Sequence, residues 1–176
     1  DGATVLGFVD KPDSTLTKLV DHCITFPLNE QLKFWMVADR LMYNAGEFPD
    51  YNNFYQQMEA HFAEDMAKIN EESDDFAAAF AEKHHEDRIH YFVAAGNQWG
   101  ATYSYSMCYW DEQHWLPAQA IEAGEFFHGF FEIVTRDTPV TIFIGEDLER
   151  PLSERVAKFL PRICANYELI DSRDYD

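Results

Sequence analysis

The chain has 176 residues, of which 32 are acidic and 13 are Lys or Arg, so its formal net charge is −19. An acidic chain of this kind is not expected to bind nucleic acid or an anionic membrane, because both attract Lys and Arg. The sequence has no run of about 18 apolar residues, the length that a membrane-spanning helix needs, and no basic stretch followed by an apolar run that would mark a secretory signal.

Residues 1–28 are predicted to be the C-terminal part of a first α/β domain. Thr4–Val9 has the composition of a strand, and Cys23–Phe26 predicts a second strand that ends at Pro27. The first strand begins almost at the first residue, and the last predicted strand of the chain ends close to the last residue. We therefore expect the chain to be an excerpt of a longer one that begins and ends inside folded units.

Residues 29–87 are predicted to form a helical connector. Asn29–Asn44 carries apolar side chains at i, i+3 and i+4, and Tyr51–Ile69 repeats this pattern. A third, shorter helix is expected to begin at Phe76. These helices are acidic on one side and aromatic on the other, which is typical of helices that pack on a core.

Strands and helices alternate from residue 88 to the end of the chain. Continuous apolar strands separated by helices predict a parallel sheet with helices on both faces, a three-layer α-β-α domain of the α/β class. The strands are expected at Ile89–Ala95, Gln119–Ile121, Pro139–Gly145 and Tyr167–Ile170, and the helices at Thr102–Gln113 and Pro151–Asn166. Residues 88–176 are therefore predicted as a second domain that is largely complete but lacks its C-terminal end.

The segment Gly96-Asn-Gln-Trp-Gly100 follows a predicted strand and precedes a predicted helix. In α/β folds, ligands bind at the carboxyl ends of strands, so Gly96 and Asn97 are candidate substrate-binding residues. The segment lacks the glycine patterns of nucleotide-binding loops. Its backbone N–H groups could meet an anion, with Thr102 and Ser104 nearby, but a plain tight turn explains the same residues, and both interpretations stay open.

No metal or other cofactor is expected from the histidines and cysteines. The run His84-His-Glu-Asp87 invites a metal interpretation, but neighbouring residues on a helix face different ways, and a solvated helix end is the favoured interpretation. His90 lies in a predicted strand and is taken as structural. Three cysteines, odd in number and far apart, predict neither a disulfide framework nor a zinc motif, and a reducing cytoplasm is the expected compartment.

Carboxylates and an imidazole gather around the segment Ala118–Gly129. Glu122, Glu125 and His128 lie in a loop with two glycines, and Glu112 lies near the end of the preceding helix. Such groups can move protons near neutral pH, and loops at strand ends commonly carry catalysis. On local sequence alone, exposed acids and a loop histidine without a function remain an equal alternative.

At this segment the sequence resembles the sugar isomerase (SIS) family. The motif Glu122-Ala-Gly-Glu-Phe-Phe-His-Gly-Phe-Phe-Glu-Ile-Val134 is similar to the Glu-Ser-Gly-Glu-Phe-x-His-Gly-Pro-x-Glu-Ile-Val of the fructoselysine-6-phosphate and glucoselysine-6-phosphate deglycases. These deglycases are relatives of the isomerase domain of glucosamine-6-phosphate synthase. The strands at Tyr91–Gly96 and Pro139–Gly145 also fit, and weaker similarity extends over the whole chain. The resemblance implies an SIS-type fold, with a partial first SIS domain and a largely complete second one.

The resemblance implies an enzyme that acts on a sugar phosphate, either a deglycase of fructosamine-type 6-phosphates or an aldose–ketose isomerase. The family's proton-moving Glu lies sixteen residues before the motif's His, which makes Glu112 the implied acid and base between C1 and C2, and His128 the implied residue for ring opening. Glu122 and Glu125 are expected to shape or line the substrate site, and the reaction needs no metal. A homodimer or larger homo-oligomer is implied, because the His of such proteins often reaches a neighbouring subunit's site.

Three positions depart from the family's pattern. Phe130 stands where the family has Pro, Tyr109 where the synthase has Lys, and Tyr105 where the family has an acid, so the sugar phosphate and its amine stay open. The family holds phosphate in Ser/Thr-rich loops of its first SIS domain, and by this resemblance the chain starts after those loops. The alternative function is a non-catalytic, regulatory module that binds sugar phosphates; Glu112 and His128 favour the enzyme.

Overall fold

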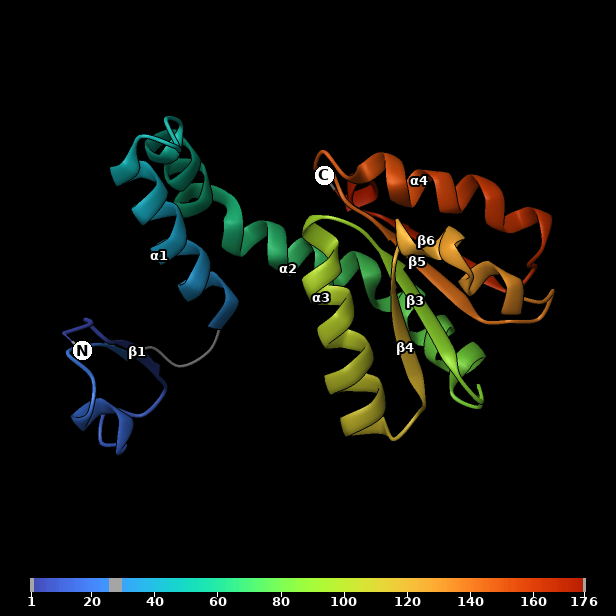
Figure 1. Ribbon diagram of the computed structural model, residues 1–176, viewed down its shortest axis with the longest axis horizontal. Helices are drawn as coiled ribbons and strands as arrows, with labels where there is room; N and C mark the ends of the chain where they lie inside the picture. The colour runs from blue at the N-terminus through green and yellow to red at the C-terminus, as the bar shows by residue number, and fades with distance from the viewer. Residues whose placement is uncertain (1, 26–29, 176) are drawn as a thin grey trace. The chain divides into compact units, whose positions relative to one another are not determined.

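The computed structural model describes residues 2–25 and 30–175. The chain forms two compact units, residues 1–67 and 68–176, which divide within helix α2 (Tyr51–His84) (Figure 1). The predicted boundary at residue 28 falls outside the described residues, so the division into a first domain, a connector and a second domain stays a prediction. Among the described helices, none combines the length and the hydropathy that crossing a bilayer requires.

A small parallel sheet and two helices make up the N-terminal unit. Strand β1 (Leu6–Val9) pairs with β2 (His22–Thr25), which confirms both predicted strands over these residues, whereas Phe26 and Pro27 lie outside the described part. Helix α1 (Glu30–Ala45) follows where a helix was expected.

Helix α2 runs without a break from the N-terminal unit into the C-terminal one, so the prediction of two separate helices in this region is wrong. The gap expected between Ile69 and Phe76 covers the polar run Asn70–Asp75. No Gly or Pro occurs between Tyr51 and His84, however, and polar side chains on an exposed helix do not end it.

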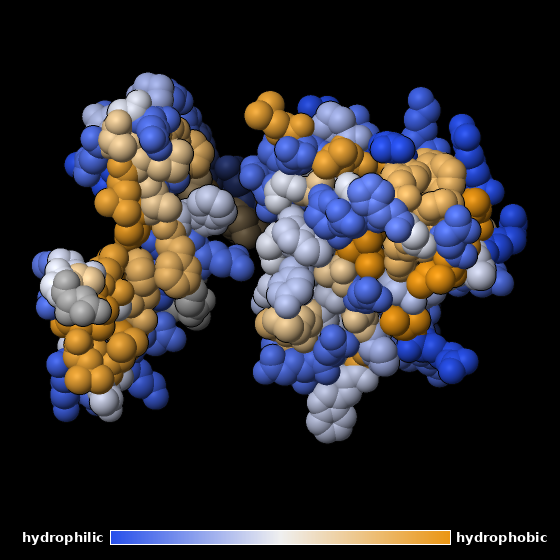
Figure 2. Space-filling view, viewed as in Figure 1, coloured by the Kyte–Doolittle hydropathy of each residue, from blue (hydrophilic) through white to orange (hydrophobic). Residues whose placement is uncertain are grey.

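Apolar side chains remain exposed on the N-terminal unit, and Figure 2 shows them gathered on its surface in the view drawn. Phe34, Trp35 and Leu41 of α1 are examples, each more than half exposed. Gly7 and Lys33 are its only described residues that are buried. The hydrophobic core therefore lies in the C-terminal unit.

A four-stranded parallel sheet forms the centre of the C-terminal unit, which confirms the predicted α/β class. The strand order is β4-β3-β5-β6, with Val93 of β3 opposite both Ile121 and Ile142. The strands are β3 (His90–Ala94), β4 (Ala118–Glu122), β5 (Val140–Ile144) and β6 (Tyr167–Asp171).

Helices cover both faces of this sheet. Because alternate residues of a strand point to opposite sides, neighbouring residues of β3 pack in different layers. On one face the ring of Phe92 packs against Trp110. On the other face Val93 and Ile142 share a core cluster with Val156. The covering helices are α3 (Asn97–Ser104), the π-helix η2 (Tyr105–His114) and α4 (Arg150–Phe159), with the 3-10 helices η3 (Glu125–His128) and η4 (Phe130–Ile133) between β4 and β5. The predicted three-layer arrangement is thus confirmed, but the helix expected at Thr102–Gln113 changes from α to π winding at residue 105.

Candidate functional site

Most candidate residues lie at and near the carboxyl edge of the four-stranded sheet. Glu112 lies toward the amino edge, because the neighbouring Asp111 accepts a hydrogen bond from the N–H of Ala118, the first residue of β4. Gly96 and Asn97 follow β3, Glu122 ends β4, and Asp147 follows β5. The chain runs from β3 outward to β4 and then returns to β5 on the other side of β3. Ligands of open α/β sheets bind at such a switch point, because the loops after the two adjacent strands lead to helices on opposite faces.

Glu122 folds the chain back on itself after β4. Its Oε2 atom accepts hydrogen bonds from the backbone N–H groups of Gly124, at 2.7 Å, and of Glu125, at 3.3 Å. A Cβ atom on Gly124 would lie 2.7 Å from this oxygen, so a side chain there would make the Glu122 carboxylate shift. The carboxylate of Glu122 therefore shapes the loop that carries Glu125 and His128.

Aromatic side chains fix the loop to the body of the domain. Phe126 is completely buried, and its ring packs against those of Phe127, Phe130 and Phe159. The ring of Phe130 also meets Tyr91 of β3 edge-on, with the ring centroids 4.7 Å apart. Phe130, which stands where the resembled family has Pro, thus contributes to the packing beneath the loop.

Glu125 and His128 face solvent at the ends of one short helical turn. Oε2 of Glu125 lies 3.2 Å from Nδ1 of His128, and the two side chains are 70% and 71% exposed. This contact leaves Nε2 of His128 without a partner among the described residues. Gly129 ends the turn with a φ of +138°, a value that L side chains rarely adopt. The loop therefore presents a carboxylate and an imidazole to solvent, while its buried aromatic side chains anchor it to the domain.

Glu112 lies on the π-helix η2, whose wider winding is frequent at functional sites. Its side chain is exposed and forms no hydrogen bond or ion pair with the described residues. Trp110, two residues earlier, is buried and anchors the helix, and Trp115 ends it with a left-handed backbone. Within the described part of the chain, no hydrogen bond or ion pair joins Glu112 to His128.

Gly96 and Asn97 meet Asp147 across the switch point. Oδ2 of Asp147 accepts a hydrogen bond from the backbone N–H of Asn97 at 2.6 Å, and Oδ1 accepts one from the N–H of Glu149 at 2.7 Å. Gly96 has φ +56° and ψ −130°, and a Cβ atom there would lie 2.2 Å from Oδ1 of Asp147. The carboxylate therefore fits only because residue 96 has no side chain.

Asp147 takes the position in which an external anion would meet the first turn of α3. The N–H groups of Asn97 and Glu149 hold the pKa of Asp147 below its usual value. The Asn97 N–H already donates to Asp147, and Thr102 is buried, so neither is free to donate a hydrogen bond to an anion at this loop. Sequence reasoning did not select Asp147. Its place two residues after the predicted strand Pro139–Gly145 is the signal that could have found it.

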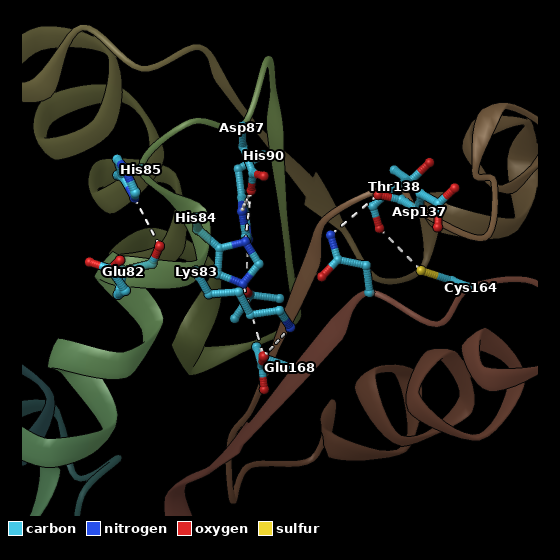
Figure 3. A network of polar contacts seen from close by, with 12 residues as sticks. Glu82, Lys83, His84, His85, Asp87, His90, Asp137, Thr138, Cys164 and Glu168 are labelled. Carbon is cyan, nitrogen blue, oxygen red and sulfur yellow. Dashed lines mark hydrogen bonds and ion pairs between the residues drawn. The ribbon is translucent and has the colours of Figure 1, made fainter.

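A polar cluster of His84, Asp87 and His90 lies at the amino edge of the same sheet (Figure 3). Oδ2 of Asp87 lies 2.7 Å from Nδ1 of His84 and 3.0 Å from Nδ1 of His90. The prediction of a solvated helix end is wrong for His84, because packing against Phe80 and His90 leaves it 1% exposed, whereas His85 is exposed. Burial lowers the pKa of His90 to about 4, although its hydrogen bond to Asp87 acts in the opposite direction.

Among the described residues, this cluster is the group that has the composition and spacing to hold a metal ion. One ligating atom from each of the three residues lies within 4.8 Å of the other two. The predicted sugar-handling residues Glu112, Glu122, Glu125 and His128 do not form such a group.

Comparison with known proteins identifies what the chain is similar to. No protein-family model matches it. Fructosamine deglycase FrlB of Bacillus subtilis is 30% identical over 186 residues, which cover 99% of this chain and 56% of that protein.

Solved structures share the fold, among them the following two. A protein of Salmonella typhimurium described as a phosphosugar isomerase superposes with a TM-score of 0.90 at 24% identity, over 99% of this chain and 57% of that one. The C-terminal domain of glucosamine-fructose-6-phosphate aminotransferase from Francisella tularensis superposes with a TM-score of 0.74 at 13% identity, over 94% of this chain and 49% of that one. The chain thus spans about half the length of each of these proteins. The resemblance seen in the motif is confirmed: over nearly its whole length the chain is similar to the phosphosugar isomerases and deglycases, and it has their SIS-type α/β fold.

Proposed function

We propose that the complete protein is an enzyme that removes the amine from a fructosamine-type 6-phosphate, with aldose–ketose isomerisation of a sugar phosphate as the related reaction. The observation that carries the proposal is the loop of Glu125 and His128. The buried Phe126 anchors this loop, and both groups face solvent. The chain is also 30% identical to a fructosamine deglycase.

The reaction requires one proton to move between two neighbouring carbons. A ketosamine 6-phosphate carries its carbonyl at C2 and its amine on C1. Removal of a proton from C1, with protonation of the C2 oxygen, gives an enediol-type (enaminol) intermediate, and return of the proton to C2, with loss of the N–H proton, leaves an imine at C1. Water then adds to the imine and releases the amine and glucose 6-phosphate. A single carboxylate held between C1 and C2 can perform both transfers, and we assign this role to Glu112.

His128 is assigned to ring opening, because the sugar must be open-chain before its C1 proton can be removed. Its Nδ1 faces Glu125, which orients the imidazole and leaves Nε2 for the sugar. A ring nitrogen of histidine can exchange a proton near neutral pH, as opening of the ring requires.

We infer that the complete site needs more than this chain. Glu112 and His128 both face solvent and do not contact each other by a hydrogen bond or an ion pair within the described residues. In a homodimer or larger homo-oligomer, groups of a neighbouring subunit would lie against the exposed faces of these two side chains. Gly96 and Asn97 then border the site, with the Asp147 carboxylate bound to the N–H of Asn97.

The test is turnover of a fructosamine 6-phosphate by the full-length protein, followed as release of free amine and glucose 6-phosphate. Glu112→Gln is expected to lower the rate roughly 10²- to 10⁴-fold, since general acid–base catalysis contributes about that much. Binding of the product glucose 6-phosphate, measured by calorimetry, should be unchanged. Glu72→Gln, an exposed glutamate on α2, is the matched control and should keep the full rate.

Two results would refute the proposal. Unchanged turnover in Glu112→Gln would remove this carboxylate from the chemistry. A full-length protein that binds sugar phosphates but releases no amine from any ketosamine, and isomerises no sugar phosphate, would be a non-catalytic binding module.

A further inference from the structure

His84, Asp87 and His90 lie apart from Gly96, Asn97 and Glu122, which border the proposed sugar site at the carboxyl edge of the sheet. His90 is the first residue of β3, whereas Gly96 follows the last, so the cluster is at the opposite edge of the sheet. The three residues join the C-terminal end of α2 to the start of β3 at a spacing of i, i+3 and i+6. We propose that His84, Asp87 and His90 form a binding site for a divalent transition-metal ion of the zinc type.

The donor set and its geometry fit such an ion. Two imidazoles and one carboxylate suit zinc and its neighbours in the first transition row. Two ligand atoms on a tetrahedral zinc ion lie roughly 3.4 Å apart, given bonds of about 2.1 Å. Oδ2 of Asp87 lies 2.7 and 3.0 Å from the two Nδ1 atoms, so each separation needs to open by less than about 1 Å. Asp87 is 17% exposed, which leaves the ion and a coordinating water a path on that side.

The second nitrogen of each ring distinguishes a metal site from a simple hydrogen-bonded cluster. Nε2 of His90 lies 2.8 Å from Oγ1 of the buried Thr141. Nε2 of His84 is buried without a hydrogen-bond partner, and Oε1 of Glu168 lies 3.9 Å away, beyond hydrogen-bond distance. Figure 3 shows His84 between Asp87 and Glu168, and Glu168 also accepts a hydrogen bond from Nζ of Lys83 at 2.6 Å.

If both Nδ1 atoms of neutral rings donated hydrogen bonds to Asp87, each Nε2 would be an acceptor. Thr141 could satisfy His90, but Nε2 of His84 would face an acceptor oxygen of Glu168 without a proton between them. If both Nδ1 atoms bind a cation instead, both Nε2 atoms carry a proton. His90 then donates to Thr141, and His84 points its N–H toward the Glu168 carboxylate. Metal-bound histidines are commonly oriented in this way, by a hydroxyl, carbonyl or carboxylate on the second nitrogen.

The ion would have a structural role that follows from the position of its ligands. It would tie the last turn of α2 to the first residue of β3, where two buried imidazoles otherwise depend on one carboxylate. This role is independent of the sugar chemistry, so the proposal stands or falls separately from the proposed function.

The test titrates the chelator-treated chain with Zn²⁺ by calorimetry and with Co²⁺ by visible absorption. We expect one equivalent of tight binding and a Co²⁺ spectrum of nitrogen and oxygen ligands without a sulfur-to-cobalt band. Asp87→Asn should abolish this binding. Thr141→Val, which keeps the side-chain shape and removes only the contact to His90, should weaken the affinity roughly 10- to 100-fold. His85→Gln is the matched control, because His85 lies next to His84 but is exposed and outside the cluster.

The expected thermal readout has the same pattern. Zn²⁺ should raise the unfolding temperature of the unchanged chain and of His85→Gln, but not that of Asp87→Asn, since a ligand that binds the folded state stabilises it. If Asp87→Asn does not fold, the Thr141→Val comparison decides. Absence of a stoichiometric site, equal affinity in Thr141→Val and His85→Gln, or a thiolate band with Co²⁺ would each overturn the proposal.

Discussion

Replacing Gly96 by alanine tests the close approach at the switch point of the sheet. The new Cβ atom would lie 2.2 Å from Oδ1 of Asp147, a separation that real Cβ atoms do not show, and the backbone has φ +56° with ψ −130°. Backbone conformations of this kind cost a non-glycine residue on the order of 1–3 kcal/mol. The carboxylate must also move, which breaks its hydrogen bond to the N–H of Asn97.

For a chain of this size, 1 kcal/mol corresponds to about 2–4 °C in unfolding temperature, so Gly96→Ala should unfold roughly 2–12 °C lower. Gly100→Ala is the matched control four residues later, in the middle of α3, where a Cβ atom meets nothing within 4 Å. Because glycine within a helix is about 0.5–1 kcal/mol less favourable than alanine, this variant should unfold roughly 1–4 °C higher.

The assay is thermal unfolding followed by circular dichroism, together with hydrogen exchange of the Asn97 amide. Exchange at Asn97 should accelerate in Gly96→Ala and stay slow in Gly100→Ala. A Gly96→Ala variant as stable as the unchanged chain would refute the reasoning. So would a Gly100→Ala variant that loses as much stability as Gly96→Ala, since the effect would then not come from the contact with Asp147.

Two further predictions concern the core and the ionic contacts of the C-terminal unit. Phe126→Ala should lower the free energy of unfolding by about 3–5 kcal/mol in urea titration, because the ring is completely buried; an equal loss from the half-buried Phe131→Ala would contradict this. The Arg150 guanidinium beside Asp171 holds the pKa of that carboxyl below its usual value, and Arg150→Met should raise it toward that value in an NMR titration. Since the folded pKa is the lower one, the pair stabilises the fold above about pH 4 and loses this effect as pH falls through the folded pKa. Unchanged titration of Asp171 in Arg150→Met would show that another group causes the shift.

Regular elements of the C-terminal unit could be predicted because each depends on its own residues. Apolar runs such as Pro139–Gly145 identify a strand that is covered on both faces, and the structure has β5 at Val140–Ile144 within that run. The parallel arrangement follows from the alternation of such strands with helices. The unbroken helix α2 was missed because separate helices were predicted on either side of the polar run Asn70–Asp75, which contains no Gly or Pro.

The candidate site was only partly predictable. The motif from Glu122 to Val134 pointed to the loop itself, because it combines carboxylates with an imidazole and resembles a motif of the SIS family. Sequence could not show that the Glu122 side chain would fold back to form the turn. Nor could it show that Asp147 would approach Gly96, since 51 positions separate these two residues. The same limit applies to His84 and His90, whose burial depends on contacts with Phe80, Thr141 and the sheet face.

The sequence by itself determined the α/β class, the strands of the C-terminal sheet and the family resemblance carried by the loop before His128. These depend on composition, periodicity and a continuous motif, all of which are local properties of the chain. Only the tertiary structure decided which polar groups meet. It placed Asp147 against Gly96 at one edge of the sheet, and it buried two histidines around Asp87 at the other. The physical reason is that such contacts depend on strand order and on the space left between side chains, and neither is encoded within any single segment.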